Sequence, residues 1–225
     1  MSTLHLLTVV HAEPLTPQII QLLFKPEHPI AYASGQYIML GFDAEDLKPF
    51  SIAAAPREDG LIECHIRNQA DSEWMQKLFA VKTGDHLVME GPKDQIALQP
   101  AHQPIILLAG GTGFAPMKAL LETLLKEKVG VPIHLYWGAR SQEELYMHQE
   151  MVALMETHAN FEYIPVLSEK TEDWNGATGL VHKQVLKQHP NLSHFNLYMC
   201  GPWPMIQTAK EEFMVAGLHV DACVH

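Results

Sequence analysis

The stretch from residue 105 to 121, IILLAGGTGFAPMKALL, sets strict limits on the fold of this chain. Four apolar residues, enough for a strand buried on both faces, run into the glycine turn Gly110, Gly111, Thr112, Gly113. A helix follows, and Pro116 suits its first turn, where a missing N–H costs nothing. Glycines let a ligand approach the turn, and a helix N-terminus favours negative charge. We therefore expect an anion at this turn.

The local pattern leaves the kind of anion open. The glycines are not followed by Lys and then Ser or Thr, which disfavours a P-loop for nucleoside triphosphates. The usual dinucleotide fingerprint has a third glycine, absent here. The next expected strand, 133–137, ends in Gly138, Ala139 and Arg140, with no acid to hold a ribose. On this pattern alone, a nucleotide site and a plain tight connection remain equally open.

The first 98 residues have the rhythm of an all-β domain. Short apolar runs separated by Pro, Gly and Asp predict strands at 4–10, 18–24, 36–42, 50–54, 61–67 and 86–90. Six strands at this spacing favour an antiparallel barrel. Ser72 suits the N-cap of one helix, whose apolar stripe of Trp74, Met75, Leu78 and Phe79 fits one end of the barrel.

After Pro100 strands alternate with helices. We expect strands at 105–109, 133–137, 161–166, 195–200 and 218–222, and helices reaching 128 and spanning 143–158, 180–188 and 204–215. This alternation predicts a five-stranded, parallel, doubly wound sheet with helices on both faces. The predicted fold is therefore β + α/β, with a barrel domain at 1–98 and an α/β domain at 99–225. Ligands of such sheets bind at the carboxyl ends of the strands, where Gly110, Gly138 and Gly201 should converge.

The amino-acid composition limits the classes of partner that this chain can bind. Among 225 residues 47% are hydrophobic, and the formal charge is −11 without any basic run, which disfavours nucleic acid and anionic membranes. We expect small-molecule partners and, with no leader or membrane-length apolar stretch in the sequence, a cytoplasmic protein. The three cysteines are far apart, and the 14 histidines form no ligand pair. Neither an iron–sulfur cluster nor another metal site is expected.

Three strings in order carry a family resemblance. They are Lys48-Pro49-Phe50-Ser51, Ala109-Gly110-Gly111-Thr112-Gly113-Phe114-Ala115-Pro116 and Met199-Cys200-Gly201-Pro202. Together they resemble the ferredoxin-NADP reductase superfamily over nearly the whole chain. The strings at 34–37, 136–140 and 145–146 look closest to those of the small NAD(P)H:flavin oxidoreductases.

The resemblance implies a flavin site on the barrel. Its residues are Lys48, Pro49, Phe50, Ser51, Ile52 and His65. In the family the aromatic residue and the serine lie against the isoalloxazine, with the hydroxyl near N5, which gives Ser51 a catalytic role. A hydroxyl both donates and accepts, which suits a nitrogen whose protonation changes on reduction. Without the other strings, a core Phe beside a strand Ser would be the favoured interpretation.

The resemblance also implies a nicotinamide nucleotide site on the sheet, for NADH or NADPH. Its residues are Gly110, Gly111, Thr112, Gly113, Pro116, Gly138, Arg140, Cys200, Gly201 and Pro202. The family equivalent of Cys200 sits beside the nicotinamide, so Cys200 is the second predicted catalytic residue.

Departures from the family pattern bear on both cofactors. Lys48 stands where the family has Arg, and a lysine cannot grip a phosphate or carbonyl in a forked geometry. Asp71 and Glu73 would repel a flavin pyrophosphate near Ser72. We therefore predict that riboflavin, FMN or FAD is an exchangeable substrate. Beyond the third sheet strand, Ser168-Glu169-Lys170 predicts that NADH is used at least as well as NADPH.

The predicted function is NAD(P)H:flavin oxidoreductase, with hydride passing from nicotinamide C4 to flavin N5 and reduced flavin supplied to an acceptor such as a flavin-dependent oxygenase. One alternative is a bound-FAD electron-transfer subunit that serves a partner oxygenase or iron–sulfur protein. Another is a flavin- or nucleotide-sensing module without turnover. Asp221, Val224 and His225 at the end of the sequence are assigned no role.

Overall fold

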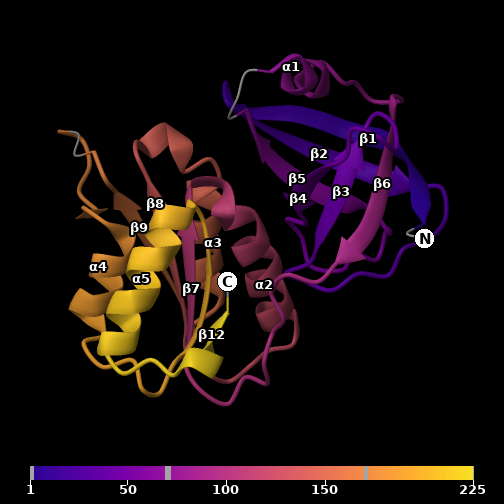
Figure 1. Cartoon of the computed structure of the whole chain (residues 1–225). Coiled ribbons are helices and arrows are strands. Elements are labelled where there is room, and N and C mark those ends of the chain that lie inside the picture. The colour runs from indigo at the N-terminus through magenta and orange to yellow at the C-terminus, as the bar shows by residue number, and fades with distance from the viewer. Residues whose placement is uncertain (1–2, 69–71, 170–171, 225) are drawn as a thin grey trace. The chain divides into compact units, whose positions relative to one another are not determined.

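The computed structural model describes residues 3–68, 72–169 and 172–224 (Figure 1). The chain divides into two compact units. The barrel unit contains the residues up to 97 together with 118–123, and the sheet unit contains 98–117 and the residues from 124 onward. The division is therefore not a single cut in the sequence, since a segment from the middle of one helix belongs to the first unit.

The barrel unit is an antiparallel sheet of six strands. These are β1 (Leu4–Thr16), β2 (Ile19–Pro26), β3 (Tyr37–Gly41), β4 (Lys48–Ser51), β5 (Ile62–Arg67) and β6 (His86–Lys93), in the order β4-β3-β6-β1-β2-β5. The two edges meet, because Ile52, directly after β4, forms an antiparallel bridge with Cys64 of β5. The sheet is thus closed, which removes the exposed edges that a six-stranded open sheet would leave.

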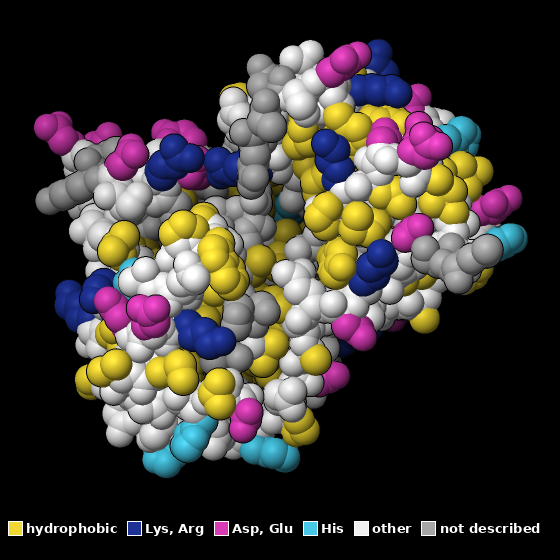
Figure 2. All heavy atoms as spheres, in the orientation of Figure 1, with side chains coloured by type: hydrophobic (Ala, Val, Ile, Leu, Met, Phe, Trp, Pro, Cys, Tyr) yellow, Lys and Arg dark blue, Asp and Glu magenta, His cyan; other side chains and the backbone are white. Residues whose placement is uncertain are grey.

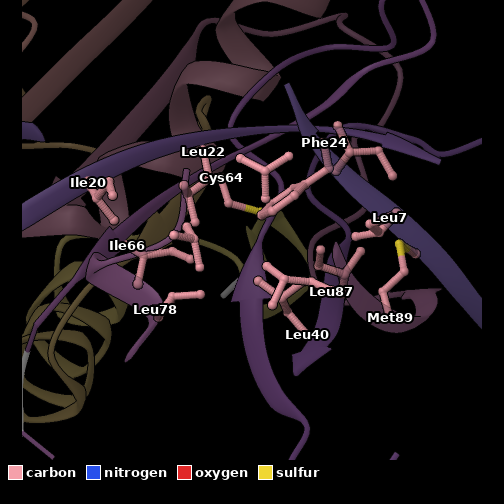
Figure 3. Close-up of a cluster of buried hydrophobic side chains, with 14 of the residues drawn as sticks. Leu7, Ile20, Leu22, Phe24, Leu40, Cys64, Ile66, Leu78, Leu87 and Met89 are labelled. Atoms are coloured by element: carbon pink, nitrogen blue, oxygen red, sulfur yellow. The ribbon is translucent and has the colours of Figure 1, made fainter. Parts of the chain in front are cut away.

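Alternation along the strands fills the barrel with apolar side chains. Leu22 and Phe24 of β2 point inward with Cys64 and Ile66 of β5, and all four are at most 1% exposed (Figure 3). Helix α1 (Glu73–Phe79) adds Leu78 and the other members of its apolar stripe to this core. The N-cap predicted at Ser72 is confirmed, because the Ser72 side chain accepts a hydrogen bond from the backbone N–H of Met75.

The sheet unit is a parallel sheet with helices on both faces. Four long strands form its centre: β7 (Ile105–Gly110), β8 (Ile133–Ala139), β9 (Phe161–Leu167) and β11 (Asn196–Cys200). Two-residue strands, β10 (Ala177–Thr178) and β12 (Cys223–Val224), extend the edges in the order β10-β9-β8-β7-β11-β12. Helices α4 (Val181–Gln188) and α5 (Trp203–Val215) pack on one face, while α2 (Phe114–Lys126) and α3 (His148–Thr157) complete the unit. The predicted fold class is confirmed, with β10 as a strand beyond the five expected.

Three predicted elements differ from the structure. The strand expected at 50–54 is β4, which begins at Lys48 and ends at Ser51. The helix expected over 143–158 is instead a short 3-10 turn, Gln142–Glu144, followed after a break by α3. The break lets Leu145 be buried and lets Tyr146 pack edge-on against the Trp137 ring. The strand expected at 218–222 begins only at Cys223, because Leu218 is buried in the core and Val220–Ala222 forms a 3-10 turn.

Candidate functional site

The glycine turn of the sheet unit lies at the point where the strand order reverses. The chain moves from β7 to β8 and β9 on one side and returns to place β11 on the other side of β7. The carboxyl ends of β7 and β11 are therefore neighbours, and Ala109 pairs with Cys200 in the register. In open parallel sheets, this reversal point is where ligands bind.

Close packing explains most glycines at this point. A Cβ atom at residue 113 would lie 2.1 Å from the carbonyl oxygen of Cys200, and one at residue 201 would lie 3.0 Å from the Cα of Gly110. A Cβ atom at residue 110 would lie 2.7 Å from the Met205 sulfur. These glycines converge as predicted. They are needed first because the turn after β7 and the turn after β11 pack so closely that side chains would not fit between them. Gly111 differs, since its φ of +55° is left-handed and favours glycine.

An aromatic stack holds the glycine turn in place. The rings of Phe114, the first residue of α2, and Trp137 of β8 are nearly parallel with centroids 3.7 Å apart. The indole N–H of Trp137 donates to the Gly111 carbonyl oxygen at 2.9 Å, and the Tyr146 ring packs edge-on against both rings. The turn that presents backbone amides is thus fixed by a buried tryptophan on the neighbouring strand.

The remaining residues predicted for the nucleotide differ in accessibility. Pro116 is buried, and a Cβ atom at residue 138 would lie 2.9 Å from Val181 Cβ, so both are packing positions. Thr112 and Gly201 are half-buried, and Pro202 is exposed. Arg140 is exposed just beyond β8, where its backbone N–H donates to a Glu144 carboxylate oxygen.

Cys200 is the last residue of β11 and is half-buried. Burial raises the pKa of the Cys200 thiol to about 11. The thiol is therefore neutral near pH 7, so it suits a small polarisable contact surface rather than a nucleophile.

Four of the six predicted flavin residues, Lys48 to Ser51, form β4, where successive side chains alternate between two sides. Pro49 and Ser51 share the outer side with Met39 and Tyr37, their register partners on β3. These four side chains are half-buried or exposed. Figure 2 shows hydrophobic side chains gathered on the visible surface over β3 and β4. This outer side combines a hydroxyl with apolar contact area.

Lys48 and Phe50 point to the other side of β4, toward α1. The Phe50 ring is stacked on the Trp74 ring, with centroids 5.9 Å apart and an angle of 14° between the planes. Lys48 Nζ lies 4.7 Å from the centroid of the same Trp74 ring. The Trp74 indole N–H in turn donates to Asp46. The predicted pair Phe50 and Ser51 is thus divided between the two sides of the strand.

Two predicted flavin residues have buried side chains. Ile52 is 0% exposed within the barrel core, and its N–H donates to the Gln36 carbonyl oxygen. The His65 ring is also 0% exposed, with Nε2 2.8 Å from Glu63 Oε1. Burial lowers the pKa of His65, so the ring is neutral near pH 7. Neither side chain is available at the surface to a ligand.

The available groups fit an anionic nucleotide and a flat, partly polar ring. Over residues 3–68, 72–169 and 172–224, neither the Ser51 hydroxyl nor the Thr112 hydroxyl has a protein hydrogen-bond partner. Amides at the start of a helix also lack intrahelical acceptors, which suits a phosphate near Gly111–Gly113. In the same described ranges, no three His, Cys, Asp or Glu side chains are grouped so as to hold a metal ion. No helix built from the described residues has the length and apolar character to cross a membrane.

Comparison with known proteins gives two family models that together span most of the chain. Residues 7–97 match an oxidoreductase FAD-binding domain, and residues 107–211 match an oxidoreductase NAD-binding domain. The chain is 32% identical over 208 residues to an NAD(P)H-flavin reductase of Vibrio harveyi, covering 89% of this chain and 88% of that protein. The chain belongs to the ferredoxin-NADP reductase superfamily. The resemblance seen in the sequence is thereby confirmed.

Other relatives in the superfamily are longer or more distant. A CDP-6-deoxy-L-threo-D-glycero-4-hexulose-3-dehydrase reductase of Yersinia pestis is 37% identical, and the match covers 89% of this chain but 60% of that protein. A ferredoxin NADP+ reductase of Neisseria gonorrhoeae, solved with FAD and NADP, superposes with a TM-score of 0.83 at 18% identity over 96% of this chain and 93% of that one. An Amycolatopsis cytochrome P450 reductase gives a TM-score of 0.90 at 24% identity, covering 100% of this chain and 70% of that one. The last two likenesses show the shared fold.

The sequence predictions missed the residues that support the site. Trp137 lies within the family-like string at 136–140 but was given no role. The feature that could have indicated one is a large indole directly before Gly138 at a strand end. Lys118 had a clearer signal, because it lies among apolar residues in the helical run FAPMKALL, where a lysine needs a buried partner. Its partner, Glu63, gave no signal beyond being an acid on a strand.

Proposed function

We propose that this chain is an NAD(P)H:flavin oxidoreductase that uses flavin as an exchangeable substrate. The observation that carries the proposal is the unpartnered, half-buried Ser51 hydroxyl on the outer side of a flavin-binding barrel, in a chain matched almost end to end with an NAD(P)H-flavin reductase. When bound, the nicotinamide and flavin supply hydride transfer from C4 to N5. The protein then needs alignment of the two rings rather than an acid–base dyad.

The roles of the residues follow from their positions. Ser51 would meet the polar edge of the flavin, and Pro49, Met39 and Tyr37 would supply apolar contact on the same side of the sheet. Thr112 and the amides of the glycine turn would hold the nucleotide phosphates. Cys200 would lie beside the nicotinamide as a small neutral group.

Loose flavin binding is supported by the surroundings of Lys48. Its ammonium lies over the Trp74 ring and offers only a point charge. Asp71, the other predicted source of phosphate repulsion, lies outside the described residues, while Glu73 begins α1. We expect the protein to lose its yellow colour on dialysis, and stoichiometric FAD retained through dialysis would contradict exchange.

The preference for NADH is supported by the neighbours of Arg140. The Glu169 N–H donates to the Arg140 carbonyl oxygen at 3.1 Å, so an acid and a base are adjacent beyond β8 and β9. A carboxylate there opposes a 2'-phosphate. Lys170 lies outside the described residues. We propose a kcat/KM for NADH at least equal to that for NADPH, and a large preference for NADPH would refute this.

A bound-flavin subunit that serves a partner protein is the second candidate. It is favoured by the 37% identity to the Yersinia pestis reductase, of which the chain spans 60%. The test is NADH oxidation by the purified protein with and without riboflavin, FMN and FAD. Turnover that depends on free flavin supports the flavin reductase, and a yellow protein that needs a protein acceptor supports the subunit. Absence of turnover in every case would leave a sensing module and overturn both.

A further inference from the structure

We propose that Lys118 and Glu122 of α2 are positioning residues for the flavin site. They hold the backbone of residues 53–55, the segment that follows Ser51 and Ile52. This inference rests on the proposed function, because Ser51 is taken as the flavin contact.

Side chains fix both ends of the segment. Lys118 Nζ donates to the Ala53 carbonyl oxygen at 3.0 Å, and the Ala55 N–H donates to Glu122 Oε2 at 2.9 Å. The Tyr32 hydroxyl donates to the Ala55 carbonyl oxygen at 2.9 Å. Strand β4 stops at Ser51, and backbone pairing continues through the Ile52–Cys64 bridge to the Ala53 N–H, which donates to the Glu63 carbonyl oxygen at 2.8 Å. The side-chain bonds therefore hold the Ala53 carbonyl and both backbone polar groups of Ala55, beyond the last backbone pair.

Lys118 is buried and forms ion pairs with the buried Glu63 and the half-buried Glu122, while Arg57 Nη1 lies 3.4 Å from Glu63 Oε2. The Lys118 side chain is 9% exposed and the Glu63 side chain 5%, with 3.3 Å between Lys118 Nζ and Glu63 Oε1. Lys118 Nζ is also 2.7 Å from Glu122 Oε1. Glu63 Oε1 lies within hydrogen-bond distance of Gln21 and His65 as well. All these groups belong to the barrel unit.

A role in stability alone does not account for this arrangement. Buried ion pairs add little to stability compared with apolar residues of similar volume, because the charges lose their hydration. What an apolar substitute would lack is the directed bond from Lys118 to Ala53, two residues beyond Ser51. The network therefore costs desolvation free energy but fixes the position of the backbone. A fixed backbone is useful where a side chain must contact a ligand in a defined geometry.

Two variants separate positioning from stability. Lys118→Met leaves the buried Glu63 with Arg57 as its remaining cation, a half-buried side chain whose Nη1 lies 3.4 Å from Glu63 Oε2, and we expect the variant to lower the melting temperature. The double variant Lys118→Met/Glu63→Gln removes both charges, retains an amide that can bond Gln21 and His65, and should recover much of that melting temperature. It still lacks the bond to the Ala53 carbonyl oxygen.

Three measurements read the positioning directly. In the flavin-free double variant, amide hydrogen exchange at residues 53–55 should be faster than in the wild type. Its Kd for FMN, from quenching of flavin fluorescence, and its KM for flavin should both rise about tenfold, while the KM for NADH changes less than about twofold. Lys118→Arg, which keeps a donor, should recover most of the flavin affinity. Lys183→Met is the matched control, because it removes an exposed lysine paired with Glu212 in the sheet unit and should leave all three readouts unchanged.

Some results would overturn the inference. These are wild-type exchange and FMN affinity in the double variant, or equal increases in the KM for flavin and the KM for NADH. Failure of the proposed function is seen separately, in the wild-type protein, as NADH oxidation that no free flavin stimulates.

Discussion

The backbone of Gly113 rests on the carbonyl group of Cys200, so that a Cβ atom at residue 113 would lie 2.1 Å from that oxygen. The start of α2 and the end of β11 are thereby joined more closely than any residue with a side chain allows. The loop that presents the helix N-terminus and the strand end that carries the thiol form one rigid piece.

Gly113→Ala tests this contact. Because the clash is with backbone, it can be relieved only by moving the turn or β11, and we expect a loss of about 2 kcal/mol or more in the free energy of unfolding. Urea denaturation measures it. Gly130→Ala is the matched control, since a Cβ atom there meets nothing within 4 Å. Equal stability of the two variants would contradict the packing argument.

Ser51→Ala removes the unpartnered hydroxyl. We expect kcat for flavin reduction to fall about tenfold to a hundredfold, because a hydrogen bond that strengthens as N5 is reduced is lost. Melting temperature should be unchanged, since no bond within the protein is removed. Ser193→Ala, another half-buried serine, serves as the control in stopped-flow flavin reduction. Wild-type kinetics in Ser51→Ala would remove Ser51 from the site.

Trp137→Phe keeps an aromatic ring against Phe114 but deletes the bond to the Gly111 carbonyl oxygen. We expect a stability loss of about 1 kcal/mol and a KM for NADH raised about fivefold, with the KM for flavin unchanged. Trp174→Phe is matched to it, because the Trp174 indole also donates to a backbone carbonyl, that of Ala177, at 2.9 Å. If both variants raise the KM for NADH equally, the turn is not specifically held by Trp137.

Because of Glu63, we expect the free energy of unfolding to decrease at low pH. Burial by itself raises its pKa, but the bond with His65 and the charge of Lys118 outweigh this and bring the pKa to about 2, from an ordinary value of 4.5. The unfolded chain therefore binds a proton more readily, so this stability is complete above about pH 4.5 and is lost as pH falls toward 2. We expect the difference in unfolding free energy between the wild type and Glu63→Gln to shrink by about 2 kcal/mol from pH 6 to pH 3.

His65 also lowers the free energy of unfolding as pH falls, but over a higher pH range than Glu63. Its folded pKa is lowered by burial, so the stability of the neutral ring is lost as pH falls below the ordinary value of 6.5. Glu63 opposes this lowering through its bond and its charge, so the pKa of His65 falls further in Glu63→Gln, and urea titrations of both proteins near pH 6.5 measure that change. A difference between them that stays constant from pH 6 to pH 3 would contradict the lowered pKa of Glu63.

The sequence was sufficient for the fold because its signals are local. Turn residues at regular spacing predicted the barrel strands, and buried apolar runs followed by glycine predicted β7 and β8. Where prediction failed, distant packing decided the outcome. The segment around Leu145 leaves the helical path to bury that residue, and Leu218 is part of the core instead of an edge strand.

For the site, residue types were easier to predict than side-chain directions. The glycine turn, Ser51 and Cys200 were recognisable as strings, but their strings did not reveal that Phe50 and Ser51 point to opposite sides of β4. Nor did they show that His65 is covered. The pairing of Lys118 with Glu63 joins residues 55 positions apart, and no periodicity within either element encodes it.

The placement of residues 118–123 in the barrel unit has a consequence for anyone who would divide or recombine this protein. A truncated chain that stops at residue 97, where the FAD-binding match ends, would contain Glu63 and Arg57 but not Lys118, the buried partner of Glu63. Residues 1–97 alone are therefore not expected to form an intact barrel unit. A chimaera that exchanges nucleotide halves has to carry the middle of α2 along with the barrel, or supply an equivalent cation from the new half.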